Sequence, residues 1–138
     1  MSVEINAVYQ GDLHCRATHG PSGHQVCTDA PADNAGKGEC FSPTDLVATA
    51  AGTCMLTLMG IIAKRSNLDI SGASVKVLKE MASAPARRIG SLDIVITVPN
   101  ASKLSQTDRE KLQRAADTCP VKQSLHPDVK LNVRYEYL

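Results

Sequence analysis

The stretch that decides the fold is SPTDLVATAAGTCMLTLMGIIAKR, which runs from Ser42 to Arg65. Ser42 is a good helix N-cap, Pro43 suits the first helical position, and Asp45 has the spacing of a capping box. No residue from Leu46 to Ala63 is charged, and the two cations that follow lie where the helix dipole favours positive charge. This stretch therefore predicts one long helix.

The uncharged run just reaches the length of a membrane span. It is rich in Ala, Gly and Thr, however, and the remaining sequence alternates like a sheet and contains no second apolar span. We therefore expect no membrane and a central helix buried on all sides. A small domain has difficulty surrounding a helix of about 33 Å, at about 1.5 Å per residue. A second subunit is expected to supply part of the cover.

Length and composition fit one domain over residues 1–138. Hydrophobic residues make up 43% and charged residues 21%, which excludes wholesale disorder. The chain has 15 Lys and Arg against 14 Asp and Glu, and its only aromatic residues are Tyr9, Phe41, Tyr135 and Tyr137. Without a basic excess or many rings for stacking, we do not expect a nucleic-acid binder.

The chain has an odd number of cysteines, which are Cys15, Cys27, Cys40, Cys54 and Cys119. A small secreted disulfide scaffold would favour an even number. The first ten residues also lack the basic and apolar regions of a secretion signal. We therefore expect reduced thiols in a cytoplasmic protein.

Short alternating runs separated by turns flank the long helix. Together they predict an α+β fold with the order β-β-β-α-β-β-α-α-β. Before the helix we expect strands at Ser2–Tyr9, Leu13–Thr18 and His24–Asp29, then an exposed loop over 30–40. After it we expect strands at Ala73–Met81, Ile89–Val98 and Val129–Tyr137, and helices at Ser105–Thr118 and from Cys119 to Leu125. Within Ile89–Val98, the alternation of apolar and polar residues shifts once by one position.

Two cysteines stand in positions where a thiol could react. Cys54 lies in the middle of the long helix, where an unpaired cysteine is most often a small core residue. Cys119 precedes Pro120 and falls near a helix N-cap, where amide groups and the helix dipole lower a thiol pKa. Local physics therefore favours Cys119 as the thiolate. If the two thiols met in space, they could form a disulfide after oxidation of one of them.

The two cysteine motifs resemble those of a known family. The run Ser42-Pro43-Thr44-Asp45-Leu46, with small residues up to Gly52-Thr53-Cys54-Met55, is similar to the central-helix motif of the OsmC/Ohr family of organic hydroperoxide reductases. Cys119-Pro120-Val121 resembles the family's second motif. The N-terminal part and Pro85-Ala86-Arg87-Arg88-Ile89 resemble the broader OsmC-like branch. The resemblance covers most of the chain and implies an intertwined homodimer, with the central helices buried between two sheets.

The resemblance also implies a role for each cysteine. Cys54 would be the peroxidatic cysteine and Cys119 would resolve its sulfenic acid, which reverses the ranking from local physics. Apolar residues flanking Cys54, namely Ala51, Met55 and Leu58, would suit an organic rather than an inorganic peroxide. The implied partners are an organic hydroperoxide and a dithiol reductant, of the lipoyl type in the best-known members. No cofactor and no metal are expected.

In the family, an arginine and an acidic residue assist the reactive thiol. Arg16 is the only arginine before the helix and is the candidate, with Arg88 as second choice; a solvated charge on a strand explains Arg16 equally well. The glutamate position of the dedicated enzymes holds Thr44, and the acid comes one place later at Asp45. An ideal helix puts Asp45 on the face opposite Cys54, and capping explains it fully. The chain is therefore expected to be a weaker peroxidase or to act on another thiol-linked substrate.

Two other functions stay open. The chain could be a non-catalytic protein that binds a small apolar or electrophilic ligand. It could also be a zinc-stabilised domain, because its N-terminal third holds six soft ligands, which are His14, Cys15, His19, His24, Cys27 and Cys40. No C-x-x-C or H-x-x-x-H spacing supports the zinc site.

Overall fold

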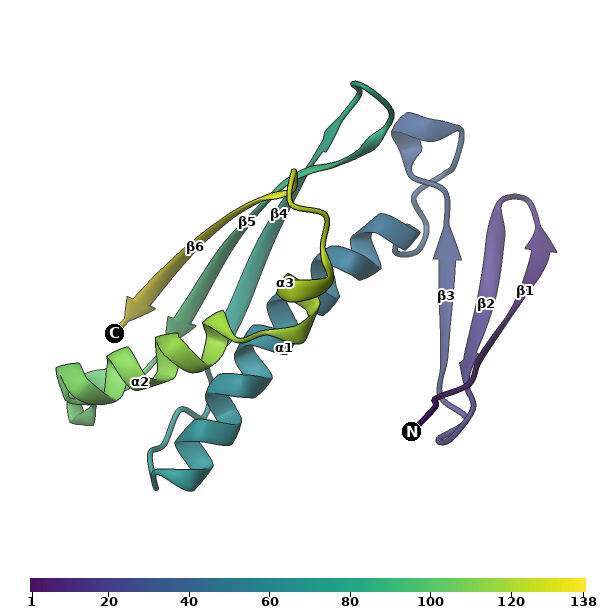
Figure 1. Ribbon diagram of the computed structural model, residues 1–138. Coiled ribbons are helices and arrows are strands. Elements are labelled where there is room, and N and C mark those ends of the chain that lie inside the picture. Colours follow the sequence, from purple (N-terminus) through teal and green to yellow (C-terminus); the bar gives the residue numbers. More distant parts are fainter. The chain divides into compact units, whose positions relative to one another are not determined.

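The order of helices and strands agrees with the sequence prediction, and Figure 1 shows them in a computed structural model that describes all 138 residues. Two short 3-10 helices, η1 (Ala32–Asn34) and η2 (Ala101–Lys103), were not predicted. The chain divides into two compact units, Met1–Val47 and Ala48–Leu138, which are described one at a time. A single domain over residues 1–138 stays a prediction.

The first unit contains an antiparallel meander of strands β1 (Ile5–Gly11), β2 (His14–His19) and β3 (Gln25–Asp29). The turn between β1 and β2 has left-handed backbone at Asp12 and Leu13, with φ of 51° and 63°. Strand β1 is almost entirely exposed, and it carries the exposed apolar side chains Ile5, Val8 and Tyr9. Its alternating apolar residues are therefore largely uncovered within this chain.

The predicted loop over 30–40 returns to the edge of the meander. After η1, the chain comes back to β3, where Thr28 and Phe41 form an isolated parallel bridge. The amide of Asp29 donates to the carbonyl oxygen of Phe41 at 3.1 Å. The loop is thus pinned to β3 immediately before the long helix begins.

The second unit is built on a sheet with the order β4-β5-β6. Strand β4 (Ser74–Ala82) is antiparallel to β5 (Arg88–Val98), and β6 (Lys130–Tyr137) is parallel to β5. One face of β5 is completely buried, at Leu92, Ile94, Ile96 and Val98. The register shifts where Glu80 pairs with Ser91 and Met81 with Ile89. This bulge explains the offset in the alternation of β5, because it places one extra residue in the strand.

Three helices complete the chain, and Figure 1 shows α1 and α2 over the β4-β5-β6 sheet. They are α1 (Pro43–Arg65), α2 (Gln106–Asp117) and α3 (Pro120–Ser124). The predicted capping box of α1 is present: the Asp45 carboxylate accepts from the Ser42 amide at 2.9 Å, and the Ser42 hydroxyl accepts from the Asp45 amide at 3.1 Å. These two hydrogen bonds satisfy donors that a helix start leaves unpaired.

Helix α1 is buried along one stripe, not on all sides, within this chain. The stripe consists of Ala48, Ala51, Gly52, Met55, Met59 and Ala63. Its apolar members join the fully buried side chains of β5 and α2 in one core. By length and composition alone α1 could cross a membrane, with a mean hydropathy of 2.0, as the core helix of a soluble protein also can. The expectation of a helix buried on all sides included cover from a second subunit, and that part stays a prediction. Within the single chain, the buried residues of α1 form this one stripe.

Gly52 allows the close approach of α1 to the sheet. A Cβ atom at this position would lie 2.7 Å from Cγ2 of Val77 and 3.1 Å from Cγ2 of Val75, both on β4. These methyl groups belong to short β-branched side chains, which have little freedom to turn away. A methyl group at position 52 would therefore push the helix away from the sheet.

We expect Gly52→Ala to lower the free energy of unfolding by about 1 kcal/mol. Overpacking costs about 1–3 kcal/mol, and the higher helix propensity of alanine offsets about 1 kcal/mol of this. Gly60→Ala is the matched control in the same helix, because a Cβ there meets nothing within 4 Å. It should raise the free energy of unfolding by up to about 1 kcal/mol. Urea denaturation of both variants checks this, and equal stabilisation by both would show that the contact is not tight.

Candidate functional site

Cys54 lies at the centre of α1, half-buried against the core. Its neighbours on the helix differ in accessibility: Ala51 and Met55 are 1% exposed and belong to the core, whereas Leu58 is only partly buried. Of the three apolar residues expected to flank the thiol and receive a substrate, only Leu58 is accessible in this chain. The other two are turned into the core because they belong to the stripe that packs on the sheet.

Cys119 lies where α2 ends and α3 begins. It is the N-cap of α3, as predicted, and its Sγ accepts from the amide of Lys122 at 3.4 Å. Its own amide donates to the carbonyl oxygen of Ala116 at 3.1 Å. Unlike an ordinary cap on the surface, this residue is fully buried, with a relative exposure of 0%.

The structure brings these two cysteines together. The Cys54 thiol lies close enough to Cys119 to raise the pKa of the Cys119 thiol, although the residues are far apart in the sequence. Both are free thiols, and both belong to the second unit. A pair of free thiols in contact can be oxidised to a disulfide without a large movement of either helix.

The pKa of the Cys119 thiol is raised, mainly by burial and further by the Cys54 thiol beside it, while the amide of Lys122 lowers it in part. The expectation that Cys119 is the thiolate is therefore wrong. The cap geometry on which it was based is present, but the sequence could not show that the cap is buried. Burial disfavours the charged form more than one amide at the start of a five-residue helix favours it.

A mostly apolar depression of about 490 Å³ lies on the same unit, between α1 and α2. Leu58, Ile61 and Ile62 of α1 line it, starting one turn after Cys54, together with Ala115 and Thr118 of the chain leading to Cys119. Three cations, Arg65, Lys111 and Arg114, also contribute. Neither cysteine lines this depression. Its lining residues Leu58 and Thr118 are nevertheless close in sequence to Cys54 and Cys119, respectively.

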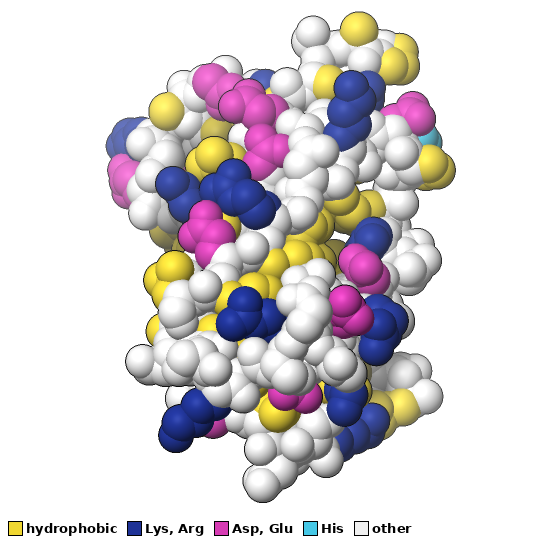
Figure 2. All heavy atoms as spheres, turned by 90° about the vertical axis from the view of Figure 1, so that its left-hand side faces the viewer, with side chains coloured by type: hydrophobic (Ala, Val, Ile, Leu, Met, Phe, Trp, Pro, Cys, Tyr) yellow, Lys and Arg dark blue, Asp and Glu magenta, His cyan; other side chains and the backbone are white.

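Charged side chains of both signs are mixed on the face seen in Figure 2, with hydrophobic atoms visible between them. The formal net charge of the chain is only +1. This face therefore presents no extended surface of one sign of the kind that binds a nucleic-acid backbone.

The two candidate arginines occupy different units. Arg16 is an exposed residue of β2 in the first unit, and its Nη1 donates weakly to Oε1 of Gln25 at 3.5 Å. Arg88 begins β5 in the second unit, which also holds both cysteines; its Nη1 donates to the carbonyl oxygen of Ile89 at 3.4 Å. The Nε of Arg88 is buried and has no acceptor within the chain. Arg88 thus keeps a donor that its own fold does not use.

The position of Asp45 agrees with its capping role. Its Oδ2 accepts the Ser42 amide in the first turn of α1. Cys54 lies nine residues further along the same helix, which at about 100° per residue is the opposite face. Thr44 makes a polar contact with the Ser42 side chain, at 3.2 Å between the two hydroxyl oxygens.

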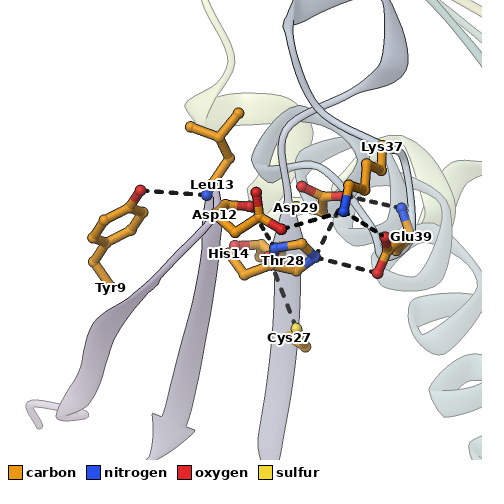
Figure 3. A network of polar contacts seen from close by, with 9 residues as sticks. All are labelled: Tyr9, Asp12, Leu13, His14, Cys27, Thr28, Asp29, Lys37 and Glu39. Carbon is orange, nitrogen blue, oxygen red and sulfur yellow. Dashed lines mark hydrogen bonds and ion pairs between the residues drawn. The ribbon is translucent and has the colours of Figure 1, made fainter.

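A polar network in the first unit was missed by sequence analysis, because no motif links its members. His14 lies between Asp29 and Glu39 (Figure 3). Its Nε2 is 3.5 Å from Oδ2 of Asp29 and 3.7 Å from Oε2 of Glu39. The Glu39 amide donates to the same Asp29 oxygen at 3.0 Å. This hydrogen bond, and the nearby His14, lower the pKa of Asp29 against the opposing effect of burial. The network holds the 30–40 loop against β2 and β3.

The six soft ligands of the N-terminal third do not gather into a metal-binding group. No three His, Cys, Asp or Glu side chains of the chain are grouped so that they could hold a metal ion. Two of the six, Cys27 and Cys40, are nevertheless neighbours, and the Cys27 thiol raises the pKa of Cys40. The first unit therefore contains a thiol pair of its own.

Comparison with solved structures finds closely similar folds. A Psychrobacter arcticus 273-4 protein, provisionally described as an osmotic stress induced and detoxification response protein, is 44% identical, with a TM-score of 0.88 over 96% of this chain and 94% of that one. Two structures of lower identity share the fold. They are an organic hydroperoxide resistance protein OsmC from Legionella pneumophila (15% identity, TM-score 0.75, 99% and 97% covered) and OhrB of Bacillus subtilis (17%, 0.70, 99% and 98%).

No curated protein matches the chain. The family model described as OsmC-like protein matches residues 36–134, which include the capped start of α1, both cysteines of the second unit and most of β6. The α+β fold, the element order and the motif resemblance all agree with this match. The chain therefore belongs to the OsmC-like protein family.

Proposed function

We propose that this chain is a thiol-dependent peroxidase that reduces organic hydroperoxides through Cys54 and Cys119 in the cytoplasm. The observation that carries the proposal is the contact between two free thiols, one on the central helix and one at a buried helix cap. The organic hydroperoxide resistance proteins among the structural neighbours support the substrate class. No cofactor is needed for this chemistry.

The reaction is a two-electron exchange between a dithiol and a peroxide. The Cys54 thiolate attacks one peroxide oxygen, the O–O bond breaks, and the alkoxide leaves and takes up a proton as an alcohol. Cys54 is then a sulfenic acid. Cys119 condenses with it, so that the S–S bond forms and water leaves. A dithiol donor, for example of the lipoyl type, reduces this disulfide by exchange and itself becomes a disulfide.

The raised pKa of Cys119 supports this division of roles. A thiol that keeps its proton does not compete for the peroxide, and its S–H can donate to a Cys54 thiolate in contact with it. Burial also protects Cys119 from bulk oxidant, because its exposure is 0%. Cys54 is the more accessible of the two sulfur positions and is the one we assign to attack.

Apolar surface near the thiols supports a preference for organic over inorganic peroxides. Leu58, Ile61 and Ile62 line the depression that begins one helical turn beyond Cys54. An alkyl group placed there would leave water, which is worth about 25 cal/mol for each Å² buried. Hydrogen peroxide has no such group and would gain nothing from this surface.

For the arginine that assists Cys54, we propose Arg16, with Arg88 as the alternative. A guanidinium would favour the thiolate and hydrogen-bond the peroxide oxygen. The resemblance supports Arg16, whereas the unused Nε donor of Arg88 supports the alternative. Asp45 is the only acid near the family's glutamate position, but its hydrogen bond to Ser42 supports a capping role, acting on the site by fixing the start of α1.

We further propose that the active form is a homodimer. Ile61 is 41% exposed on a helix with no charge along most of its length, and β1 carries exposed Ile5, Val8 and Tyr9. Exposed apolar side chains gathered on one element, as on β1, favour an interface there. A second copy of the chain is the occupant that the resemblance implies.

Cumene hydroperoxide tests the peroxidase. The reduced protein should lose two thiols per chain and the mass of two hydrogen atoms, as measured by thiol titration and intact mass. Cys54→Ser should react at a rate at least about 100-fold lower, whereas Cys119→Ser should still be oxidised but stop at a sulfenic acid that dimedone traps. Unchanged thiols in the unmodified protein would contradict the enzyme and favour a ligand-binding protein.

Lysine substitutions distinguish the two arginines. The assisting arginine, when replaced by lysine, should lose about 10- to 100-fold in the second-order rate of Cys54 oxidation, since a hydrogen bond to a charged group is worth about 1.5–3 kcal/mol. Stopped-flow rates for Arg16→Lys and Arg88→Lys give the answer. If neither variant slows the reaction tenfold, no arginine named here assists the thiol.

Light scattering tests the dimer. At micromolar concentration the solution mass should be twice the chain mass of 14.7 kDa. Ile61→Asp places a charge on the uncovered face of α1 and should shift the equilibrium toward the monomer, whereas Leu78→Asp, an exposed position on β4, serves as the control. A monomeric mass for the unmodified protein would contradict the assembly.

A further inference from the structure

The backbone places a second pair of cysteines side by side in the first unit. Thr28 of β3 and Phe41 form a parallel bridge, and the Asp29 amide donates to the Phe41 carbonyl oxygen at 3.1 Å. Cys27 and Cys40 each come one residue earlier. In a parallel pair, residues one step before the bridged ones are again neighbours, and both point to the face opposite the bridged side chains.

The side chains are close, as this register requires. The Cys27 thiol acts on the pKa of Cys40, its own Sγ donates to the carbonyl oxygen of Thr28 at 3.8 Å, and both cysteines are half-buried and unoxidised. The spacing also suits a covalent bond: paired strands lie about 4.8 Å apart, and the Cα atoms of a disulfide lie about 4.4–6.8 Å apart. Neighbouring positions of paired strands are therefore within the separation that a disulfide spans.

We propose that Cys27 and Cys40 are a second dithiol–disulfide couple, oxidised by low-molecular-weight disulfides through thiol–disulfide exchange. It is separate from the Cys54 and Cys119 pair, to which the peroxide chemistry is assigned. Its partner is a small disulfide such as oxidised glutathione, written here as RSSR.

The exchange takes place in two steps. The Cys27 thiolate attacks one sulfur of RSSR, the S–S bond breaks, and RS⁻ leaves and takes up a proton. Cys40, losing its proton, then attacks the Cys27 sulfur of the mixed disulfide and a second RSH leaves. In total the two protein thiols lose two electrons and two protons, and RSSR becomes two RSH.

The surroundings of the pair determine which thiol attacks first. The hydrogen bond with Cys27 and burial raise the pKa of Cys40, and the negative charges of Asp29 and Glu39 act in the same direction. Cys40 therefore keeps its proton more readily than an ordinary thiol, which suits it to the closing step. This assigns the first attack to Cys27 and the closing step to Cys40.

The bond would close the loop that precedes α1. The segment between the two cysteines contains η1 and Lys37, and the Asp29–Glu39 hydrogen bond already holds its end against β3. Oxidation would make this attachment covalent just before Ser42, the N-cap of the helix that carries Cys54. The start of α1 would then be fixed independently of the polar network.

The Cys54→Ser/Cys119→Ser double variant isolates the second pair, so failure of the proposed peroxidase does not affect the test. The reduced variant is incubated with oxidised glutathione, its remaining thiols are alkylated, and it is digested with trypsin. Trypsin cleaves after Arg16 and Lys37, which separates Cys15, Cys27 and Cys40 into different peptides. We expect the mass to fall by two hydrogen atoms, and peptide 17–37 to be linked to peptide 38–64.

Single substitutions in the same background supply the controls. Cys15 pairs with Thr28 and Arg16 pairs with Cys27, so Cys15 lies on the other face of the sheet. Cys15→Ser should therefore leave the linked peptides unchanged. Cys27→Ser should give only a glutathione adduct or a free thiol at Cys40. Persistent glutathione adducts on both Cys27 and Cys40, a link to Cys15, or an unchanged thiol count would overturn the proposal.

Discussion

The close approach of α1 to the β4-β5-β6 sheet is the constraint on which the second unit depends. Gly52 permits it, since any Cβ there would collide with the methyl groups of Val75 and Val77. The buried stripe of α1 then packs on the four fully buried side chains of β5. Because α1 is held close to the sheet, Cys54 at the centre of the helix is half-buried. Cys119, which lies between α2 and α3, is then placed beside Cys54.

The two thiol pairs are built by different physical means. Tertiary packing of three helices brings Cys54 and Cys119 together, whereas a backbone bridge at the edge of the meander aligns Cys27 with Cys40. In each pair one thiol has a raised pKa, and the leading causes differ. Burial dominates at Cys119, while the hydrogen bond with Cys27 dominates at Cys40. Burial at Cys119 and the neighbouring thiol at Cys40 thus have the same direction of effect, since each raises the pKa of one cysteine of its pair.

The chain belongs to the OsmC-like family, but the acidic residue in the first turn of α1 differs in position from the family motif. The family motif is present, but the acid at Asp45 is used in a capping box with Ser42, on the face of the helix opposite Cys54. Thr44, at the position of the family's glutamate, makes a hydroxyl contact with the same serine. The start of α1 is therefore organised for helix stability, and in the proposed reaction Asp45 does not contact Cys54.

The sequence by itself determined the elements, because caps, alternation and turns are local: the capping box at Ser42, the strands of the meander and the cap at Cys119 are all confirmed. The two sheets were expected from the family resemblance and are confirmed, whereas the parallel pairing of β5 with β6 was not predicted. Nor could the sequence give the raised pKa of the Cys119 thiol or the backbone bridge beside Cys27. Burial and through-space contacts decide these, and they depend on residues distant in the chain that only tertiary packing brings together.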